Sequence, residues 1–335
     1  MKVKSPLNPK TATAQNSGQL PPEVRPGQSV ELLKELHILT RDGKLNQDSR
    51  RKLKQVYHLY QFIEKLLLLE LPDAGTHASL ADHGAGKSYL GFILYDLFFK
   101  AQAASDEPAS GAIPPSTLPA TRSAKGPTSP RADTPGGHIY GIESRAELVT
   151  QSQDLARRLG FTRMSFLNQS VAESAHSTDM PDRIDVVTAL HACDTATDDA
   201  IAFGLQKHAT FMVLVPCCQA EVARVLGGSK ALCLARTPLA ELWRHPLHTR
   251  EMGSQITNVL RCLYLEASGY QVTVTELVGW EHSLKNELIL ARYTGHRKRA
   301  AAERLAAIVR EFGLEELLQT RFKLPALANA PEAIT

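Results

Sequence analysis

The stretch Asp82-His83-Gly84-Ala85-Gly86-Lys87-Ser88 decides the fold of this chain. It follows a short run that predicts a strand over residues 79–82 and precedes a pattern that predicts a helix over 89–100. Two glycines let the backbone turn tightly and approach a ligand without a Cβ in the way. The start of the following helix offers free N–H groups. The stretch therefore predicts a ligand-binding turn at the carboxyl end of a strand in an α/β sheet.

Two common phosphate-binding patterns do not fit this turn. A P-loop requires glycine at position 81, where the chain has Ala81, and a dinucleotide fingerprint requires glycine at position 89, where it has Tyr89. Asp82, directly after the strand, is also poorly placed beside phosphate groups. These departures disfavour an NTPase and a NAD-dependent enzyme.

A second part of the predicted site is Glu143, which ends the predicted strand 138–142. An acidic side chain at the end of the second strand accepts hydrogen bonds from the ribose hydroxyls of an adenosine-type ligand. Its distance from Gly86 becomes the expected one, about 20 residues, only when residues 102–137 are left out. That segment is dominated by small and polar residues and by proline, which cannot build a core. It is predicted to be a disordered insertion inside one βαβ unit.

The chain outside this site divides into further regions. Residues 1–28 predict a disordered leader, and 29–75 a helical N-terminal extension with its main helix capped by Asp48 or Ser49. Residues 76–295 alternate strands and helices, which predicts one α/β domain with a mostly parallel sheet. Residues 296–335 predict a C-terminal helix and tail. The apolar face of the main helix consists of Leu53, Val56, Tyr57, Tyr60, Ile63 and Leu67.

Composition narrows the class of protein. The chain has 335 residues, a formal net charge of +3 and five cysteines, none in a C-x-x-C pair. Free thiols in a reducing compartment and the lack of an apolar leader predict a soluble, cytoplasmic protein. No stretch is long and apolar enough to predict a membrane span. Residues 41–54 contain six basic and two acidic residues, a distribution that favours phosphate binding as well as an ordinary solvated helix face.

The motifs together resemble those of a known family. The stretch 82–90 resembles motif I of the class I S-adenosylmethionine-dependent methyltransferases, in its D-x-G-x-G-K-[GS]-Y-L form. Glu143 matches their ribose-binding acid, and Ser170 stands where many members carry an adenine-contacting Asp. The stretches 190–194 (LHACD) and 215–218 (VPCC) resemble a branch with L-H-x-C-[GD] and P-C-C motifs. That branch includes relatives of the transfer RNA 2′-O-methyltransferases of the Trm-thirteen type and many bacterial members.

The resemblance implies a fold and a cofactor. The fold would be a Rossmann-like α/β domain with a seven-stranded, mostly parallel sheet and an antiparallel last strand. The cofactor would be S-adenosylmethionine, with Asp82, Gly84 and Gly86 at its methionine part, Glu143 at the ribose and Ser170 near the adenine. The enzyme would be a methyltransferase.

Candidate catalytic residues follow the fourth and fifth predicted strands. His191 is a candidate base or acceptor-orienting group, and a structural histidine beneath the cofactor is the alternative. Cys217 and Cys218 suggest a nucleophile for methylating a pyrimidine carbon, but the Pro-Cys that accompanies this chemistry is replaced around Cys193. Packing of small buried cysteines is favoured. Adjacent cysteines without a C-x-x-C spacing also disfavour zinc, so no metal is expected.

The acceptor is inferred from the family resemblance and from charge. Arg50, Arg51 and Lys54 are the predicted substrate-binding residues, and RNA modification of transfer or ribosomal RNA is the leading interpretation. A small-molecule or protein methyltransferase is one alternative. A non-catalytic cofactor-binding protein of the same fold is another.

Overall fold

A single twisted sheet organises the chain. The computed structural model describes residues 20–71, 77–100, 137–190, 192, 194–216, 220–228, 237–277 and 286–323. The strands are β1 (Ser79–His83), β2 (His138–Glu143), β3 (Met164–Asn168), β4 (Val186–Leu190), β5 (Phe211–Val215), β6 (Tyr270–Glu276) and β7 (Glu287–Tyr293). They form a seven-stranded sheet in the order β3-β2-β1-β4-β5-β7-β6. β1 to β5 are parallel, and β7 is antiparallel to both β5 and β6.

This topology confirms the predicted Rossmann-like α/β fold. The strand order reverses between β1 and β4, because β2 and β3 follow on one side and β5 on the other. At such a switch point the connections leave the sheet in opposite directions, and a crevice opens at the carboxyl ends of the strands. The carboxyl ends of β1, β2 and β4 are therefore the expected place for a ligand.

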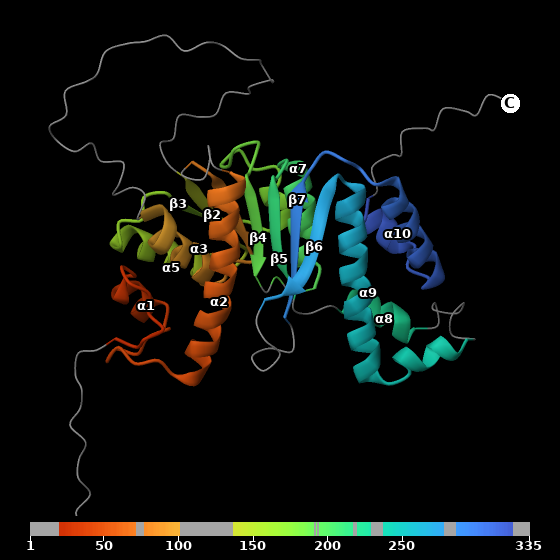
Figure 1. Cartoon of the computed structure of the whole chain (residues 1–335), viewed down its shortest axis with the longest axis horizontal. Coiled ribbons are helices and arrows are strands. Elements are labelled where there is room, and N and C mark those ends of the chain that lie inside the picture. The colour runs from red at the N-terminus through yellow and green to blue at the C-terminus, as the bar shows by residue number, and fades with distance from the viewer. Residues whose placement is uncertain are drawn as a thin grey trace, which may run out of the picture.

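Helices cover both faces of the sheet. One face is packed by the first part of the chain and the other by the last part, with two separate apolar cores. Figure 1 shows α2 beside the sheet at one end and α9 with α10 at the other. The helices are α1 (Val30–Glu35), α2 (Gln47–Lys65), η1 (Leu66–Glu70), α3 (Tyr89–Leu94), η2 (Tyr95–Phe99), α5 (Ala146–Arg158), α6 (Val171–Ser174), α7 (Ala196–Gln206), α8 (Glu221–Gly227), η4 (Pro238–Trp243), α9 (Pro246–Ala267), α10 (Arg299–Glu311) and α11 (Glu316–Thr320). No helix in the described part of the chain is long and apolar enough to cross a membrane.

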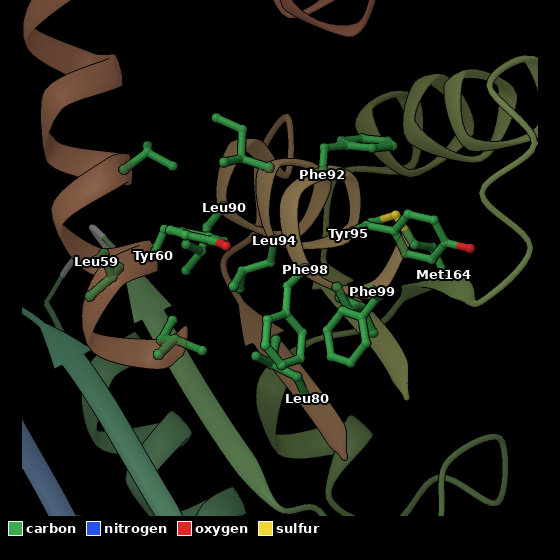
Figure 2. Close-up of a cluster of buried hydrophobic side chains, with 14 of the residues drawn as sticks. Leu59, Tyr60, Leu80, Leu90, Phe92, Leu94, Tyr95, Phe98, Phe99 and Met164 are labelled. Atoms are coloured by element: carbon green, nitrogen blue, oxygen red, sulfur yellow. The ribbon is translucent and has the colours of Figure 1, made fainter. Parts of the chain in front are cut away.

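The core beneath α2 follows from the helical spacing of its apolar residues. The predicted face of α2 is buried, and Leu59 adds to it. Figure 2 shows Leu59 and Tyr60 of α2 near Leu90 and Leu94 of α3, with Leu80 of β1 below them. Each large side chain buried here contributes about 1.5–3 kcal/mol relative to an exposed one. The N-terminal extension is thus packed into the same core as the strands that carry the predicted site.

The cap of α2 differs from the prediction. Asn46, not Asp48 or Ser49, precedes the helix, and its Oδ1 accepts a hydrogen bond of 2.7 Å from the Ser49 N–H. An asparagine side chain satisfies one of the free N–H groups of the first turn as well as the predicted residues would. The helix therefore begins slightly earlier in the chain than predicted.

The last part of the predicted disordered leader, residues 1–28, is structured. Residues 1–19 lie outside the described residues, but 20–28 form turns that pack on α2. The Arg25 guanidinium lies 4.6 Å from the ring centroid of Tyr57 and 4.8 Å from that of Tyr60. A cation held over two aromatic faces stabilises this polar segment, which composition alone assigned to disorder.

The C-terminal helix predicted within residues 296–335 is broken in two. α10 ends at Glu311, and Gly313 adopts a φ of +66° before α11 begins. The Leu314 N–H donates to the Val309 carbonyl at 2.8 Å, which closes the end of the helix. Glycine takes this left-handed conformation at little cost, so the chain stops the helix here.

The predicted insertion also lies almost wholly outside the described residues, since only residue 137 of 102–137 is described. Its two flanks are nevertheless adjacent. β1 and β2 are paired in parallel from Ser79 with His138 to His83 with Ile142. The chain on either side of the insertion therefore completes one βαβ unit, as predicted.

Candidate active site

The glycine-rich turn after β1 has an unusual backbone. Gly84 and Gly86 have φ values of +62° and +56°, and Ser88, the residue before α3, has +50°. A Cβ on Gly84 would lie 3.7 Å from the Ala192 Cβ, an ordinary contact, so conformation rather than space calls for glycine there. The Ala85 N–H donates to the Ile142 carbonyl at 3.2 Å. The turn is thereby attached to the end of β2.

Glu143 at the end of β2 meets this turn. Its side chain is buried, and Oε2 accepts a hydrogen bond of 2.8 Å from the Gly86 N–H. Arg145 donates to the same carboxylate from its guanidinium and its backbone N–H, with Nε at 2.9 Å and Nη2 at 3.0 Å. These bonds, the guanidinium first, hold the pKa of Glu143 below its usual value. The carboxylate is therefore charged at neutral pH, as a ribose acceptor requires.

Asp82 lies inside the sheet at the end of β1. Its side chain is 3% exposed, and Oδ1 accepts a hydrogen bond of 2.7 Å from the hydroxyl of Thr188 on β4. Burial raises the pKa of Asp82 to about 7, against the lowering effect of that hydrogen bond. Among the described residues, no basic side chain contributes to this pKa. A buried carboxylate without a cation is a site suited to an ammonium group.

Ser170 is engaged in a different role from the predicted one. It precedes α6; its Oγ accepts from the Glu173 N–H at 3.3 Å, and its backbone N–H donates to the Glu173 carboxylate at 2.8 Å. This is a capping box, and the S-x-x-E spacing in the sequence was a sufficient signal for it. A contact of Ser170 with adenine stays a prediction.

The catalytic candidates His191, Cys217 and Cys218 lie outside the described residues, as does Cys193. The residues next to them are held by a buried ion pair that the sequence did not reveal. Arg261 of α9 is wholly buried and contacts both carboxylate oxygens of Asp198, at 2.6 and 2.8 Å.

The same arginine reaches the segment that follows β4. Its Nη2 donates to the Asp194 carbonyl at 2.9 Å, and Asp194 Oδ1 accepts from the Ala220 N–H at 3.0 Å. Asp194 has a φ of +51°, a conformation that costs energy in a residue other than glycine. The ends of β4 and β5 are thus joined to each other and to α9. The sequence signal for this network was Arg261 itself, a charged residue within an otherwise mainly apolar stretch of α9.

The predicted RNA-binding residues lie at the start of α2. Arg50 is paired with Glu23, and Arg51 lies 3.9 Å from Asp48, with both arginine side chains more than half exposed. Lys54 is also exposed. Between them, the Lys52 Nζ lies 5.9 Å from the ring centroid of Tyr89, the first residue of α3. The structure therefore places this basic surface next to the helix that follows the glycine-rich turn.

Two other features of the described residues bear on the site. They contain no group of three or more His, Cys, Asp or Glu side chains placed to hold a metal ion. The larger of two described cavities, about 650 Å³, is lined by residues of α8, η4 and α9. None of the predicted site residues lines it.

Comparison with known families identifies the domain. Residues 51–109 and 131–225 match the model of a family described as a methyltransferase domain. The matched part of the chain is similar to a methyltransferase domain. The match includes the glycine-rich turn, β2 with Glu143, and β4 and β5. No curated protein sequence matches the chain.

Among solved structures, similarity to the methyltransferase domain is low. Magnesium protoporphyrin IX methyltransferase from Synechocystis PCC 6803, with S-adenosylhomocysteine bound, is 13% identical with a TM-score of 0.39, over 80% of this chain and 95% of that one. The Podospora anserina methyltransferase PaMTH1 is 10% identical with a TM-score of 0.40, over 87% and 100%. TrmK of M. capricolum is 9% identical with a TM-score of 0.36, over 72% and 70%.

The described residues of the methyltransferase domain fit S-adenosylmethionine, its cofactor. Asp82 offers a buried carboxyl group, bonded to the Thr188 hydroxyl, for the α-ammonium of the methionine part. Glu143 offers a charged carboxylate for the ribose hydroxyls. The turn at Gly84 and Gly86 lies between them and lets a ligand approach the backbone. These three features occur together at the carboxyl ends of β1 and β2.

Proposed function

We propose that this methyltransferase transfers the methyl group of S-adenosylmethionine to RNA, with transfer or ribosomal RNA as the acceptor. The observation that carries the proposal is the position of the basic surface of α2. Lys52 contacts Tyr89 at the start of α3, one residue after the glycine-rich turn ends. An RNA strand bound along residues 50–54 would pass close to the cofactor.

The cofactor supplies an activated methyl group on a sulfonium. The protein's main task is therefore to hold the acceptor in line with the carbon–sulfur bond. In the proposed assignment, Asp82 pairs with the ammonium, Glu143 accepts from the ribose hydroxyls, and Gly84 and Gly86 allow the close approach of the backbone. Ser170 is assigned to the adenine end.

The acceptor loses a proton when its nucleophilic atom takes the methyl group. His191 follows β4 directly and is proposed to take that proton or to orient the acceptor. The nearby Asp194 is anchored by Arg261 and by the Ala220 N–H. Cys217 and Cys218 follow β5, and they would serve as nucleophiles only if the acceptor atom were a pyrimidine carbon.

The charge of the α2 surface supports a polyanionic acceptor. Arg51, Lys52 and Lys54 are exposed on one stretch of helix. Phosphate groups bound there would release counterions, so RNA binding would weaken steeply as salt is raised. A small neutral acceptor has no use for such a surface.

A labelling experiment tests the function. The protein is incubated with methyl-labelled S-adenosylmethionine and with separate cellular fractions of RNA, protein and metabolites. Label in the RNA fraction is the expected result. Label confined to the protein or metabolite fraction identifies one of the other acceptor classes. Binding of the cofactor without transfer to any fraction would indicate a non-catalytic protein of this fold.

A further inference from the structure

The carboxylate of Glu143 is fully occupied by donors. Oε1 accepts from the Arg145 backbone N–H at 3.1 Å, from its Nε at 2.9 Å and, more weakly, from the Ser144 Oγ at 3.5 Å. Oε2 accepts from the Gly86 N–H at 2.8 Å and from the Arg145 Nη2 at 3.0 Å. An ionised carboxylate has about four lone-pair positions, so these donors use its capacity.

Ribose binding at Glu143 requires two of these positions. The two backbone donors are fixed by the turn after β1 and by the start of α5, and any residue other than proline at position 145 would keep its N–H there. The two guanidinium donors are on a flexible side chain that is 59% exposed. These two, together with the long contact of the exposed Ser144 hydroxyl, are the donors that can leave when the hydroxyls of a ribose arrive.

We propose that Arg145 sets the cofactor affinity of this enzyme: its guanidinium occupies the two acceptor positions on Glu143 that the ribose hydroxyls need, and it must leave before the cofactor binds. This inference rests on the assignment of Glu143 as the ribose acceptor. Arg145 keeps the carboxylate charged and oriented while the site is empty. It then competes with the ligand for the same oxygen atoms.

The displaced guanidinium has another partner nearby. Glu147 lies in the first turn of α5 and acts electrostatically on Arg145 in the same direction as Glu143. The exchange therefore moves one charged group from the buried carboxylate of Glu143 to the exposed carboxylate of Glu147. Because the guanidinium is 59% exposed, water screens the pair; opening it costs on the order of 1 kcal/mol, so the open form is a substantial fraction of the molecules. The apparent affinity is reduced by that fraction.

Titration calorimetry with S-adenosylhomocysteine tests the inference. Arg145→Ala and Arg145→Met, which keeps the aliphatic stem, are expected to bind about two- to fivefold more tightly than the wild type. Arg157→Ala is the matched control, since Arg157 is an exposed arginine of the same helix that pairs with Asp154 at 2.8 Å. It should bind like the wild type. Unfolding temperatures of the ligand-free proteins show whether each variant is folded.

Salt provides a readout that a purely structural role would not change. Raising the ionic strength screens the solvent-facing guanidinium from Glu143, so the advantage of Arg145→Ala over the wild type should shrink between about 0.05 and 0.5 M salt. Equal or weaker binding by both folded Arg145 variants overturns the inference while the proposed cofactor site stands. If the wild type does not bind S-adenosylhomocysteine, both the site and the inference fail.

Discussion

The two halves of the carboxyl edge of the sheet are built in different ways. At the ends of β1 and β2, the site is made from backbone turns and from side chains close to them, such as Glu143 and Arg145. At the ends of β4 and β5, the described residues are held from a distance by Arg261 of α9. One half depends on local conformation and the other on a buried charge network.

This difference predicts which amino-acid substitutions each half tolerates. A backbone turn fixed by glycines keeps its shape when a distant side chain is altered. The segment after β4 is held by Arg261, so replacing this one residue of α9 removes its anchor. The carboxylate of Asp198 would then stay buried without a partner, which adds a desolvation cost. Cofactor binding should therefore be separable from methyl transfer, and the variants below test that separation in order of expected effect.

The largest effect is expected at the β4 end. His191→Ala should lower the transfer rate about 10²- to 10⁴-fold, because a general base or orienting group is removed. Cofactor affinity should change little, and Cys217→Ser and Cys218→Ser should stay active. Single-turnover transfer from labelled cofactor measures the rate. An inactive serine variant, together with a trapped covalent RNA–protein adduct, would instead point to methylation of a pyrimidine carbon.

The second-largest effect is expected for Arg261, which anchors the segment after β4. Arg261→Met should lower the free energy of unfolding by about 3–5 kcal/mol, because Asp198 is left buried and unpaired. Urea denaturation measures the decrease. Arg244→Ala is the matched control, since Arg244 pairs with Glu241 at 3.0 Å on the exposed surface and should cost less than about 1 kcal/mol. Similar decreases in the two variants would contradict the buried network.

At the β1–β2 end, Glu143→Ala should weaken S-adenosylhomocysteine binding. It removes two charge-assisted hydrogen bonds to the ribose, each worth about 1.5–3 kcal/mol. Gly84→Val should weaken binding as well, since valine resists a φ of +62°. Calorimetric titration measures the affinity. Unchanged affinity in both folded variants would contradict the assignment of Gly84 and Glu143 to the cofactor site.

Asp82 predicts a pH dependence of cofactor affinity. Its pKa of about 7 means that below pH 7 the carboxyl is increasingly protonated and must lose that proton to pair with an ammonium. Affinity should therefore fall as pH is lowered, by up to about tenfold per unit. The ligand-free protein should behave in the opposite sense: the raised pKa stabilises the protonated fold, and stability decreases as pH rises from about 4 to 7. Asp82→Asn should flatten both profiles, which calorimetry and urea denaturation across this pH range would measure.

The smallest effect is expected at the α2 surface. Arg51→Glu together with Lys54→Glu should reduce RNA affinity and lower the slope of its salt dependence by about one for each phosphate group that is no longer bound. Binding of labelled RNA at several salt concentrations measures both. Cofactor affinity should not change, because the described hydrogen bonds of Asp82 and Glu143 do not involve these side chains. RNA binding that is indifferent to the reversal would favour a small-molecule or protein acceptor.

Much of the cofactor half could be predicted from sequence because its signals are local. Gly84 and Gly86 mark a turn wherever they occur between a strand and a helix, and Glu143 ends an apolar strand. The partners of these residues could not be predicted in the same way. Asp82 and Thr188 are 106 positions apart, and Arg261 and Asp198 are 63 positions apart.

The sequence by itself determined the order of strands and helices, the glycine-rich turn and the acid after β2, because each depends on a few neighbouring residues. Only the tertiary structure decided which polar groups are paired: the Thr188 hydroxyl with Asp82, the Arg145 side chain with Glu143, and Arg261 with Asp198. It also placed the start of α2 beside Tyr89. The physical reason is that electrostatic and hydrogen-bond partners depend on distance in space and on burial, and both arise only when the sheet is closed between its two layers of helices.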